Sequence, residues 1–209
     1  MQIIQIEAGP VATIGYLVLD SKSKSAVIID APFESTAYFE SVITEKELMV
    51  EAILLTHTHW DHIADCSRLA ELTKAPVYVN SNDFHRLNNP MEHTIFPLPF
   101  KIEAVTEVNF VHDNDKIKVG SLEFEVLFTP GHTEGGICFV EHNEGAVFAG
   151  DTLFKDSIGR VDLPGGSMPV ILESIDSKLM VLPDNFVVYS GHGPSTTIGW
   201  ERVHNPFFS

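Results

Sequence analysis

A cluster of histidine and aspartate residues occupies segment 56–62, which reads THTHWDH. It follows the apolar run 52–55, which predicts a buried strand, and it precedes apolar residues spaced as one face of a helix. His57 and His59 are two positions apart, so their side chains can point the same way from an extended backbone. Asp61 and His62 follow where the chain enters the helix and can face a second point. Imidazoles and a carboxylate are ligands that zinc and similar metals prefer, so the segment predicts a metal site rather than a solvated polar turn.

Three later segments share one local form, in which a strand-like run ends at a turn that contains glycine. His132 lies in TPGHT, Asp151 in AGDT and His192 in SGHG. Glycine lets the backbone turn tightly and approach a site closely. Each turn carries a residue type that binds metals, so together with segment 56–62 they predict one shared site at a sheet edge.

The elements that must position these residues alternate between strands and helices. In the first half, strands are predicted over 4–6, 14–19, 26–29, 52–55 and 77–79, with helices over 35–48 and from 63 to 74. In the second half, strands are predicted over 108–111, 116–119, 122–127, 137–140, 146–149 and 187–189, with helices over 170–181 and 197–203. This rhythm predicts an α/β sandwich. Segment 90–100 combines prolines with apolar residues and predicts a loop, either a hydrophobic lid beside the site or a loop packed on the core.

The composition of the 209 residues is that of an ordinary globular protein, with 44% hydrophobic and 20% charged residues. The formal net charge of -16 argues against nucleic acid and anionic lipid as partners. Cys66 and Cys138 lie in apolar patterns and are expected in the core, which suits a reducing compartment. The N-terminus enters a strand pattern without a signal peptide, and no membrane segment is expected, so the predicted location is the cytoplasm.

These motifs resemble those of a known family. His57, His59, Asp61, His62, His132, Asp151 and His192 resemble the seven-ligand set of the metallo-β-lactamase superfamily. The motifs THTHWDH, GHT, GDTLF and GHG are most similar to the glyoxalase II-like (hydroxyacylglutathione hydrolase-like) branch, and segment 159–166 resembles a loop of its short bacterial members. The resemblance implies a four-layer αββα sandwich that forms one domain over residues 1–209.

The resemblance also implies a role for each ligand. His57, His59 and His132 would bind a first metal, and Asp61, His62 and His192 would bind a second. Asp151 would bridge the two, which argues against the most common true β-lactamases because they lack this aspartate. The implied cofactors are two divalent metal ions, with zinc expected and iron or manganese as alternatives. Asp61 would also orient the attacking water as the catalytic residue.

The sequence departs from the family pattern at three places. Ala64 and Asp65 replace glycines after the histidine motif, and we expect Asp65 to face solvent. Gly136 replaces a second histidine, so an outer partner of the site is missing. The chain ends at Ser209 without the C-terminal helical domain that helps glyoxalase II bind glutathione. Arg160 resembles a basic residue that contacts the thiol part of the substrate, and a structural salt bridge with Asp162 or Glu173 is its alternative role.

The function implied by the resemblance is hydrolysis of a small-molecule thioester, similar to S-2-hydroxyacylglutathione. The alternatives are a persulfide dioxygenase with one iron bound by His57, His132 and Asp151, a lactonase, and a non-enzymatic metal-binding protein. The remaining histidines are expected on the surface or in loops. The sequence leaves the oligomeric state open.

Overall fold

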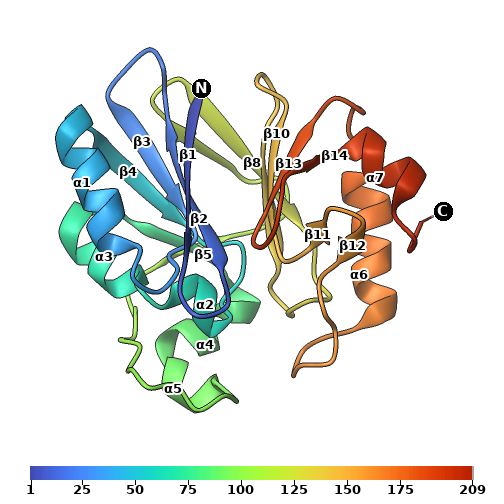
Figure 1. Ribbon diagram of the computed structural model, residues 1–209, viewed down its shortest axis with the longest axis horizontal. Coiled ribbons are helices and arrows are strands. Elements are labelled where there is room, and N and C mark those ends of the chain that lie inside the picture. Colours follow the sequence, from blue (N-terminus) through green and yellow to red (C-terminus); the bar gives the residue numbers. More distant parts are fainter. Residues whose placement is uncertain (209) are drawn as a thin grey trace. The chain divides into compact units, whose positions relative to one another are not determined.

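A computed structural model describes residues 1–208 of the chain. The chain divides into two compact units, one formed by Met1–Phe110 and Lys118–Leu122 and the other by Val111–Ile117 and Glu123–Ser209. Each unit contains most of one six-stranded mixed sheet and helices that pack on it (Figure 1). The predicted α/β class and its two sheets with helices are therefore confirmed, while the extent of a single domain over 1–209 stays a prediction.

The first sheet has the strand order β1-β2-β3-β4-β5-β6. Its strands are β1 (Gln2–Ala8), β2 (Thr13–Leu19), β3 (Ser25–Ile29), β4 (Met49–Leu54), β5 (Val77–Asn80) and β6 (Asn109–Val111). β3, β4 and β5 are parallel, whereas β2 is antiparallel to β3. The carboxyl ends of β3 to β5 and the amino end of β2 therefore meet at one edge. The sequence places Thr13, Asp30, the histidine turn and Asp83 at or just beyond this edge.

The helices of the first unit are shorter than predicted. They are α1 (Thr36–Lys46), α2 (Trp60–Ile63), α3 (Cys66–Thr73), the 3-10 turn η1 (Ser81–Asp83), α4 (Phe84–Asn88) and α5 (Pro90–His93). The helix predicted to run continuously from 63 to 74 breaks at Ala64 and Asp65, because the Asp65 N–H donates to the Ala31 carbonyl after β3 (3.0 Å). The loop predicted over 90–100 begins instead as α5, and its irregular part starts at Thr94.

Asp65 corrects a second expectation. Its side chain is 1% exposed rather than facing solvent. Asp65 Oδ2 accepts hydrogen bonds from the Thr36 N–H (3.0 Å) and the Thr36 hydroxyl (2.7 Å). The carboxylate therefore ties the first residue of α1 to the start of α3.

The second sheet has the order β14-β13-β10-β9-β8-β7. Its strands are β7 (Lys116–Val119), β8 (Leu122–Phe128), β9 (Ile137–Glu141), β10 (Ala146–Gly150), β13 (Val187–Ser190) and β14 (Thr196–Thr197), and a small hairpin joins β11 (Leu153–Phe154) to β12 (Ser157–Ile158). β8 and β10 are each antiparallel to β9, and β10 is parallel to β13. The carboxyl ends of β8, β10 and β13 therefore lie at one edge of the sheet. The segments that carry His132, Asp151 and His192 follow these strands at that edge.

The helices of the second unit are α6 (Met168–Ser174) and α7 (Ile198–His204), and a π-helical turn, η2 (Ile175–Leu179), continues α6. Ile171, Ile175 and Leu179 are fully buried against the sheet residues Val147 and Val188, so this helix packs on the second sheet. The second sheet and its helices thus support the loops that contain His132, Asp151 and His192.

Both cysteines are free and buried, as predicted. Burial raises the pKa of the Cys66 thiol to about 12 and that of the Cys138 thiol to about 11. Neither thiol is therefore a ready nucleophile at neutral pH.

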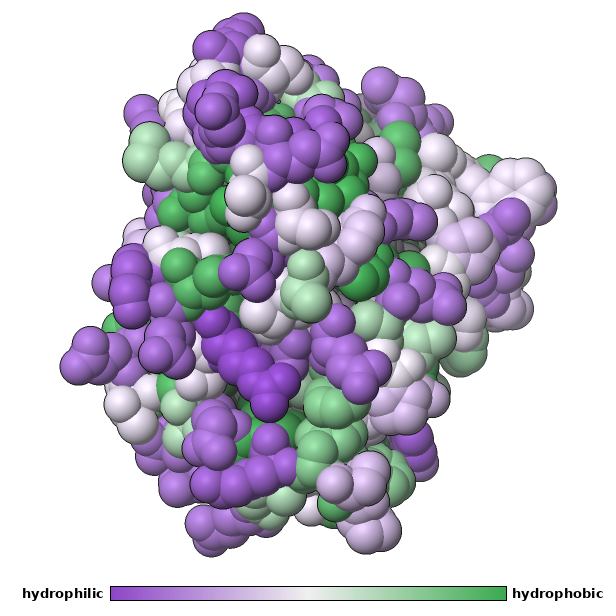
Figure 2. Space-filling view, turned by 60° about the vertical axis from the view of Figure 1, so that its left-hand side comes forward, coloured by the Kyte–Doolittle hydropathy of each residue, from purple (hydrophilic) through white to green (hydrophobic). Residues whose placement is uncertain are grey.

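The surface seen in Figure 2 is largely covered by hydrophilic and intermediate residues, with smaller hydrophobic patches between them. Among residues 1–208, no helix has both the length and the apolar character needed to cross a membrane.

Candidate metal centre

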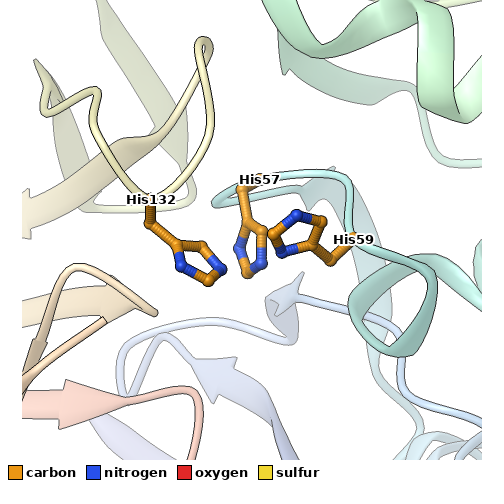
Figure 3. Close-up of side chains that lie close together, drawn as sticks. All are labelled: His57, His59 and His132. Atoms are coloured by element: carbon orange, nitrogen blue, oxygen red, sulfur yellow. The ribbon is translucent and has the colours of Figure 1, made fainter. Parts of the chain in front are cut away.

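The four predicted ligands of the first unit lie on one short turn after β4. The rings of His57 and His59 meet edge to face, with centroids 4.9 Å apart and planes at 89° (Figure 3). The His57 and His62 ring centroids are 4.1 Å apart, and His62 Nε2 lies 3.5 Å from Asp61 Oδ2. His57, Asp61 and His62 are buried, while His59 is half-buried. The four side chains therefore lie close together on this turn.

Asp30, directly after β3, fixes both ends of this turn. It accepts hydrogen bonds from the Thr56 N–H (2.8 Å) and the Thr56 hydroxyl (2.7 Å), and its Oδ2 atom lies 2.8 Å from His62 Nδ1. A carboxylate at Nδ1 fixes the ring and leaves Nε2 to face a metal, which is the usual arrangement of metal-binding histidines. Asp30 has a positive φ of 59°, an uncommon conformation for a residue other than glycine, and it is 1% exposed. The hydrogen bonds to Thr56 and His62 hold the Asp30 side chain in place and support this uncommon backbone conformation.

Two further contacts position the turn. The Thr13 hydroxyl, at the start of β2, donates to Asp61 Oδ2 (2.7 Å). Asp83 accepts from the Thr58 backbone N–H (3.1 Å) and forms an ion pair with Arg86 at 3.1 Å, and both Thr58 and Arg86 are buried. The Thr58 hydroxyl donates to the Asp83 carbonyl (2.8 Å). Thr58, between His57 and His59, is therefore held by the segment after β5, and the Asp61 carboxylate is held by the start of β2.

The second unit groups its three predicted ligands around one carboxylate oxygen. Asp151 Oδ2 lies 3.5 Å from His132 Nε2 and 3.5 Å from His192 Nε2. His132 Nδ1 lies 2.7 Å from the Arg160 carbonyl oxygen, so the outward ring atom is again fixed by an acceptor. His132 is buried, and Asp151 and His192 are half-buried.

These spacings fit a metal better than direct hydrogen bonds. The nitrogen-to-oxygen distances of 3.5 Å in the His62–Asp61, His132–Asp151 and His192–Asp151 pairs exceed the usual hydrogen-bond length. Two ligand atoms bound to one tetrahedral ion at about 2.1 Å lie about 3.4 Å apart. The imidazole and carboxylate donors therefore suit a divalent metal in both chemistry and spacing.

Gly159 allows the loop after β12 to lie against the Asp151 backbone. A Cβ atom at this position would be 1.8 Å from the Asp151 carbonyl oxygen and 3.2 Å from His132 Nδ1. No side chain fits there, so the close approach that places the Arg160 carbonyl on His132 requires glycine.

Arg160 forms a two-bond ion pair with Asp162. Its Nε and Nη2 atoms donate to the two carboxylate oxygens, each at 2.7 Å, and both side chains are exposed. The hydrogen bond from Arg160 lowers the pKa of Asp162 to about 2. This ion pair is the structural salt bridge expected as the alternative role of Arg160. A contact between Arg160 and the substrate stays a prediction.

Sequence reasoning missed the partners that hold the ligands, namely Thr13, Asp30, Asp83 and the Arg160 carbonyl. Asp30 carried a usable pattern, since it is an acidic residue directly after an apolar strand at the same edge as the histidines. The other histidines, His85, His93, His112, His142 and His204, are half-buried or exposed and lie outside this cluster, as predicted.

Known proteins are similar to this chain in sequence and in fold. The chain is 34% identical to the hydroxyacylglutathione hydrolase GloC of Haemophilus influenzae over 89% of this chain and 88% of that protein. The crystal structure of BLEG-1 B3 metallo-beta-lactamase has a TM-score of 0.91 and 35% identity, covering 100% of both chains. The structure of ETHE1 from Myxococcus xanthus has a TM-score of 0.83 and 30% identity over 99% of this chain and 84% of that one. Residues 9–192, which include every predicted ligand, match the model of the metallo-beta-lactamase superfamily, and the chain belongs to that superfamily.

Proposed function

We propose that the chain is a thioester hydrolase that binds two divalent metal ions. His57, His59 and His132 would bind the first ion (Figure 3), and Asp61, His62 and His192 would bind the second. Asp151 would bridge them, and His57, His62 and Asp151 form a third group with suitable ligand atoms. Zinc suits this mixture of imidazole and carboxylate, and iron or manganese are the alternatives.

The position of Asp151 is the observation that carries the proposal. One oxygen of its carboxylate is equally distant, at 3.5 Å, from a histidine proposed for each ion. A carboxylate between two ligand sets can neutralise part of the charge of two neighbouring cations. A site with one metal ion does not need a carboxylate in this position, so Asp151 favours a site with two ions.

Two metal ions would supply a polarised carbonyl and an activated water at neutral pH. Asp61 would orient that water, and the hydrogen bond from Thr13 keeps its carboxylate in a fixed position. The water oxygen adds to the thioester carbonyl carbon, the carbon–sulfur bond breaks, and the products are a carboxylate and a thiol. A thiol has a pKa of about 8.5, so the thiolate can leave without first receiving a proton. This suits a site whose acidic and basic side chains are proposed as metal ligands and are not available as proton donors.

The name of the relative from Haemophilus influenzae supports an S-2-hydroxyacylglutathione-like substrate. Arg160 is the proposed contact for an anionic group on the thiol part, and this contact would require its ion pair with Asp162 to open. The net charge of -16 supports a small molecule rather than nucleic acid or an anionic membrane as the partner. A cytoplasmic site of action is part of the same proposal.

A persulfide dioxygenase is the second candidate, favoured by the similarity to the ETHE1 structure. It would use one iron bound by His57, His132 and Asp151, a set of two histidines and one carboxylate. A lactonase would use the same ligands as the thioesterase. A non-enzymatic metal-binding protein would turn over none of these substrates.

The test combines metal analysis with a substrate panel on one purified preparation. Metal per chain is measured by plasma mass spectrometry, and turnover is measured with S-lactoylglutathione, a lactone, a β-lactam and, in an oxygen electrode, glutathione persulfide. Two metals per chain with thioester hydrolysis would support the proposal. One iron per chain with oxygen consumption would establish the dioxygenase instead, and selective lactone or β-lactam hydrolysis would reject the thioesterase.

A further inference from the structure

We propose that Phe33, Trp60 and Phe100 form an aromatic wall that binds an apolar acyl group of the thioester. This inference rests on the proposed hydrolase function and narrows its substrate. Phe33 follows β3, Trp60 begins α2, and Phe100 lies in the irregular segment after α5. All three belong to the first unit and are only partly buried.

The three rings form one continuous surface. Phe33 and Phe100 are stacked, with centroids 3.8 Å apart and planes at 12°. The Trp60 ring lies 6.2 Å from Phe100 at 51°. All three pack against the buried core of the first unit, which anchors them. Because each ring is partly exposed, the three can offer apolar contact area to a ligand.

The segment before Phe100 carries further exposed apolar side chains. Ile95 is 57% exposed and Phe96 is 42% exposed, and Met91 on α5 is 42% exposed. Pro97 and Pro99 limit the backbone conformations of the segment just before Phe100. Neighbouring exposed apolar side chains on a folded protein indicate a binding surface, because water contact is unfavourable for them.

Trp60 connects the wall to the ligand segment, because it lies between His59, proposed for the first ion, and Asp61, proposed for the second. The acyl substituent is attached directly to the carbonyl carbon that these ions would polarise. The thiol part of a glutathione-like substrate is polar and anionic, so the apolar wall suits the acyl group. An apolar or aromatic acyl group therefore fits these rings better than the small methyl group of a lactoyl thioester.

The test compares two thioesters that share the thiol and differ only in the acyl group. S-mandeloylglutathione carries a phenyl group where S-lactoylglutathione carries a methyl group. In the protein with its metals bound, we expect kcat/KM to be higher for the mandeloyl ester. Phe100→Ala should lower kcat/KM for the mandeloyl ester about 10-fold, mainly through KM, and change the lactoyl value less than about 2-fold.

Phe207→Ala is the matched control, since Phe207 is a partly exposed phenylalanine (43%) near the C-terminus and outside the wall. It should leave the ratio of the two esters unchanged. Trp60→Phe, which keeps an aromatic ring, should retain more of the mandeloyl preference than Trp60→Leu. Metal content of every variant is measured, because Trp60 adjoins His59.

A binding measurement separates recognition from turnover. S-phenacylglutathione and S-acetonylglutathione are thioethers that cannot be hydrolysed, and they differ in the same phenyl and methyl groups. Calorimetry should show tighter binding of the phenacyl compound, with the difference lost in Phe100→Ala. If both thioesters are hydrolysed but Phe100→Ala affects them equally, the aromatic wall is not the acyl site. If neither thioester is hydrolysed and neither thioether binds, both the inference and the proposed function fail.

Discussion

His62 Nδ1 and Asp30 Oδ2 lie 2.8 Å apart, and both side chains are almost completely buried. Asp30 also binds Thr56, so one carboxylate connects the start of the histidine turn to its last ligand. Oriented imidazoles bind metals more tightly than free ones, and changing such an outer partner commonly costs 10–100-fold in affinity or activity. The histidine turn therefore depends on a residue that is not itself a ligand.

Asp30→Asn should lower metal affinity by about 10-fold or more, because an amide cannot accept hydrogen bonds at both of its terminal atoms. Asp65→Asn is the matched control, since Asp65 is an equally buried carboxylate that binds Thr36 rather than a histidine. Both variants should unfold at lower temperature, but only Asp30→Asn should lose metal in a chelator competition. Equal metal affinity in the two variants would show that Asp30 has only a structural role.

Asp151→Asn should lower metal content and hydrolysis together while the fold persists. Removing the negative charge leaves two proposed cations with less shielding between them, which favours loss of one ion. Metal per chain, circular dichroism and thioester turnover are measured on the same sample. Asp176→Asn is the control for removing an exposed carboxylate. A variant that keeps two metals and near-normal turnover would show that Asp151 does not bridge them.

The sequence was sufficient for the ligand turn because its information is local. His57, His59, Asp61 and His62 fall within six residues, and the apolar strand before them specifies the backbone. The α/β class followed from strand and helix periodicity in the same way. The ends of the elements were less predictable, as the break between α2 and α3 depends on a backbone hydrogen bond to Ala31.

The supporting contacts could not be predicted because they join distant positions. Thr13 and Asp61 are 48 residues apart, and Asp30 and His62 are 32 apart. A single threonine or aspartate at the end of a strand resembles an ordinary turn residue. Only the strand order, which brings β2 to β5 to one edge, reveals which of these side chains meet. Asp65 was expected in solvent for the same reason.

Asp20→Asn should destabilise the protein at neutral pH and less so in acid. Hydrogen bonds from the Lys22 N–H and the Ser121 N–H hold the pKa of the Asp20 carboxyl well below its usual range. A lowered folded-state pKa gives stability that is present above the unfolded pKa of about 3.9 and is lost as pH falls below it. The difference in urea midpoint between the two proteins should therefore shrink as pH falls through about 4. A constant or growing difference would contradict this assignment.

Arg160→Ala should raise KM for thioesters with an anionic thiol part and leave kcat nearly unchanged if Arg160 contacts that group. Asp162→Ala should have the opposite effect on KM, because it releases the guanidinium from its ion pair. The two variants are compared with S-lactoylglutathione and with the same acyl group on uncharged mercaptoethanol. If KM for both esters is unchanged in both variants, the Arg160–Asp162 pair is structural.

Gly159→Ala should weaken metal binding although residue 159 has no side chain. The added Cβ would overlap the Asp151 carbonyl oxygen, so the backbone must move away and take the Arg160 carbonyl from His132 Nδ1. Gly193→Ala is the control next to another ligand, since a Cβ there meets no atom within 4 Å. That control still costs about 1 kcal/mol because Gly193 has a positive φ. Both variants should therefore have a lower melting temperature than wild type. Added zinc should raise the melting temperature of Gly193→Ala but not that of Gly159→Ala. If zinc stabilises Gly159→Ala as much as Gly193→Ala, the Arg160 carbonyl does not position His132 for the metal.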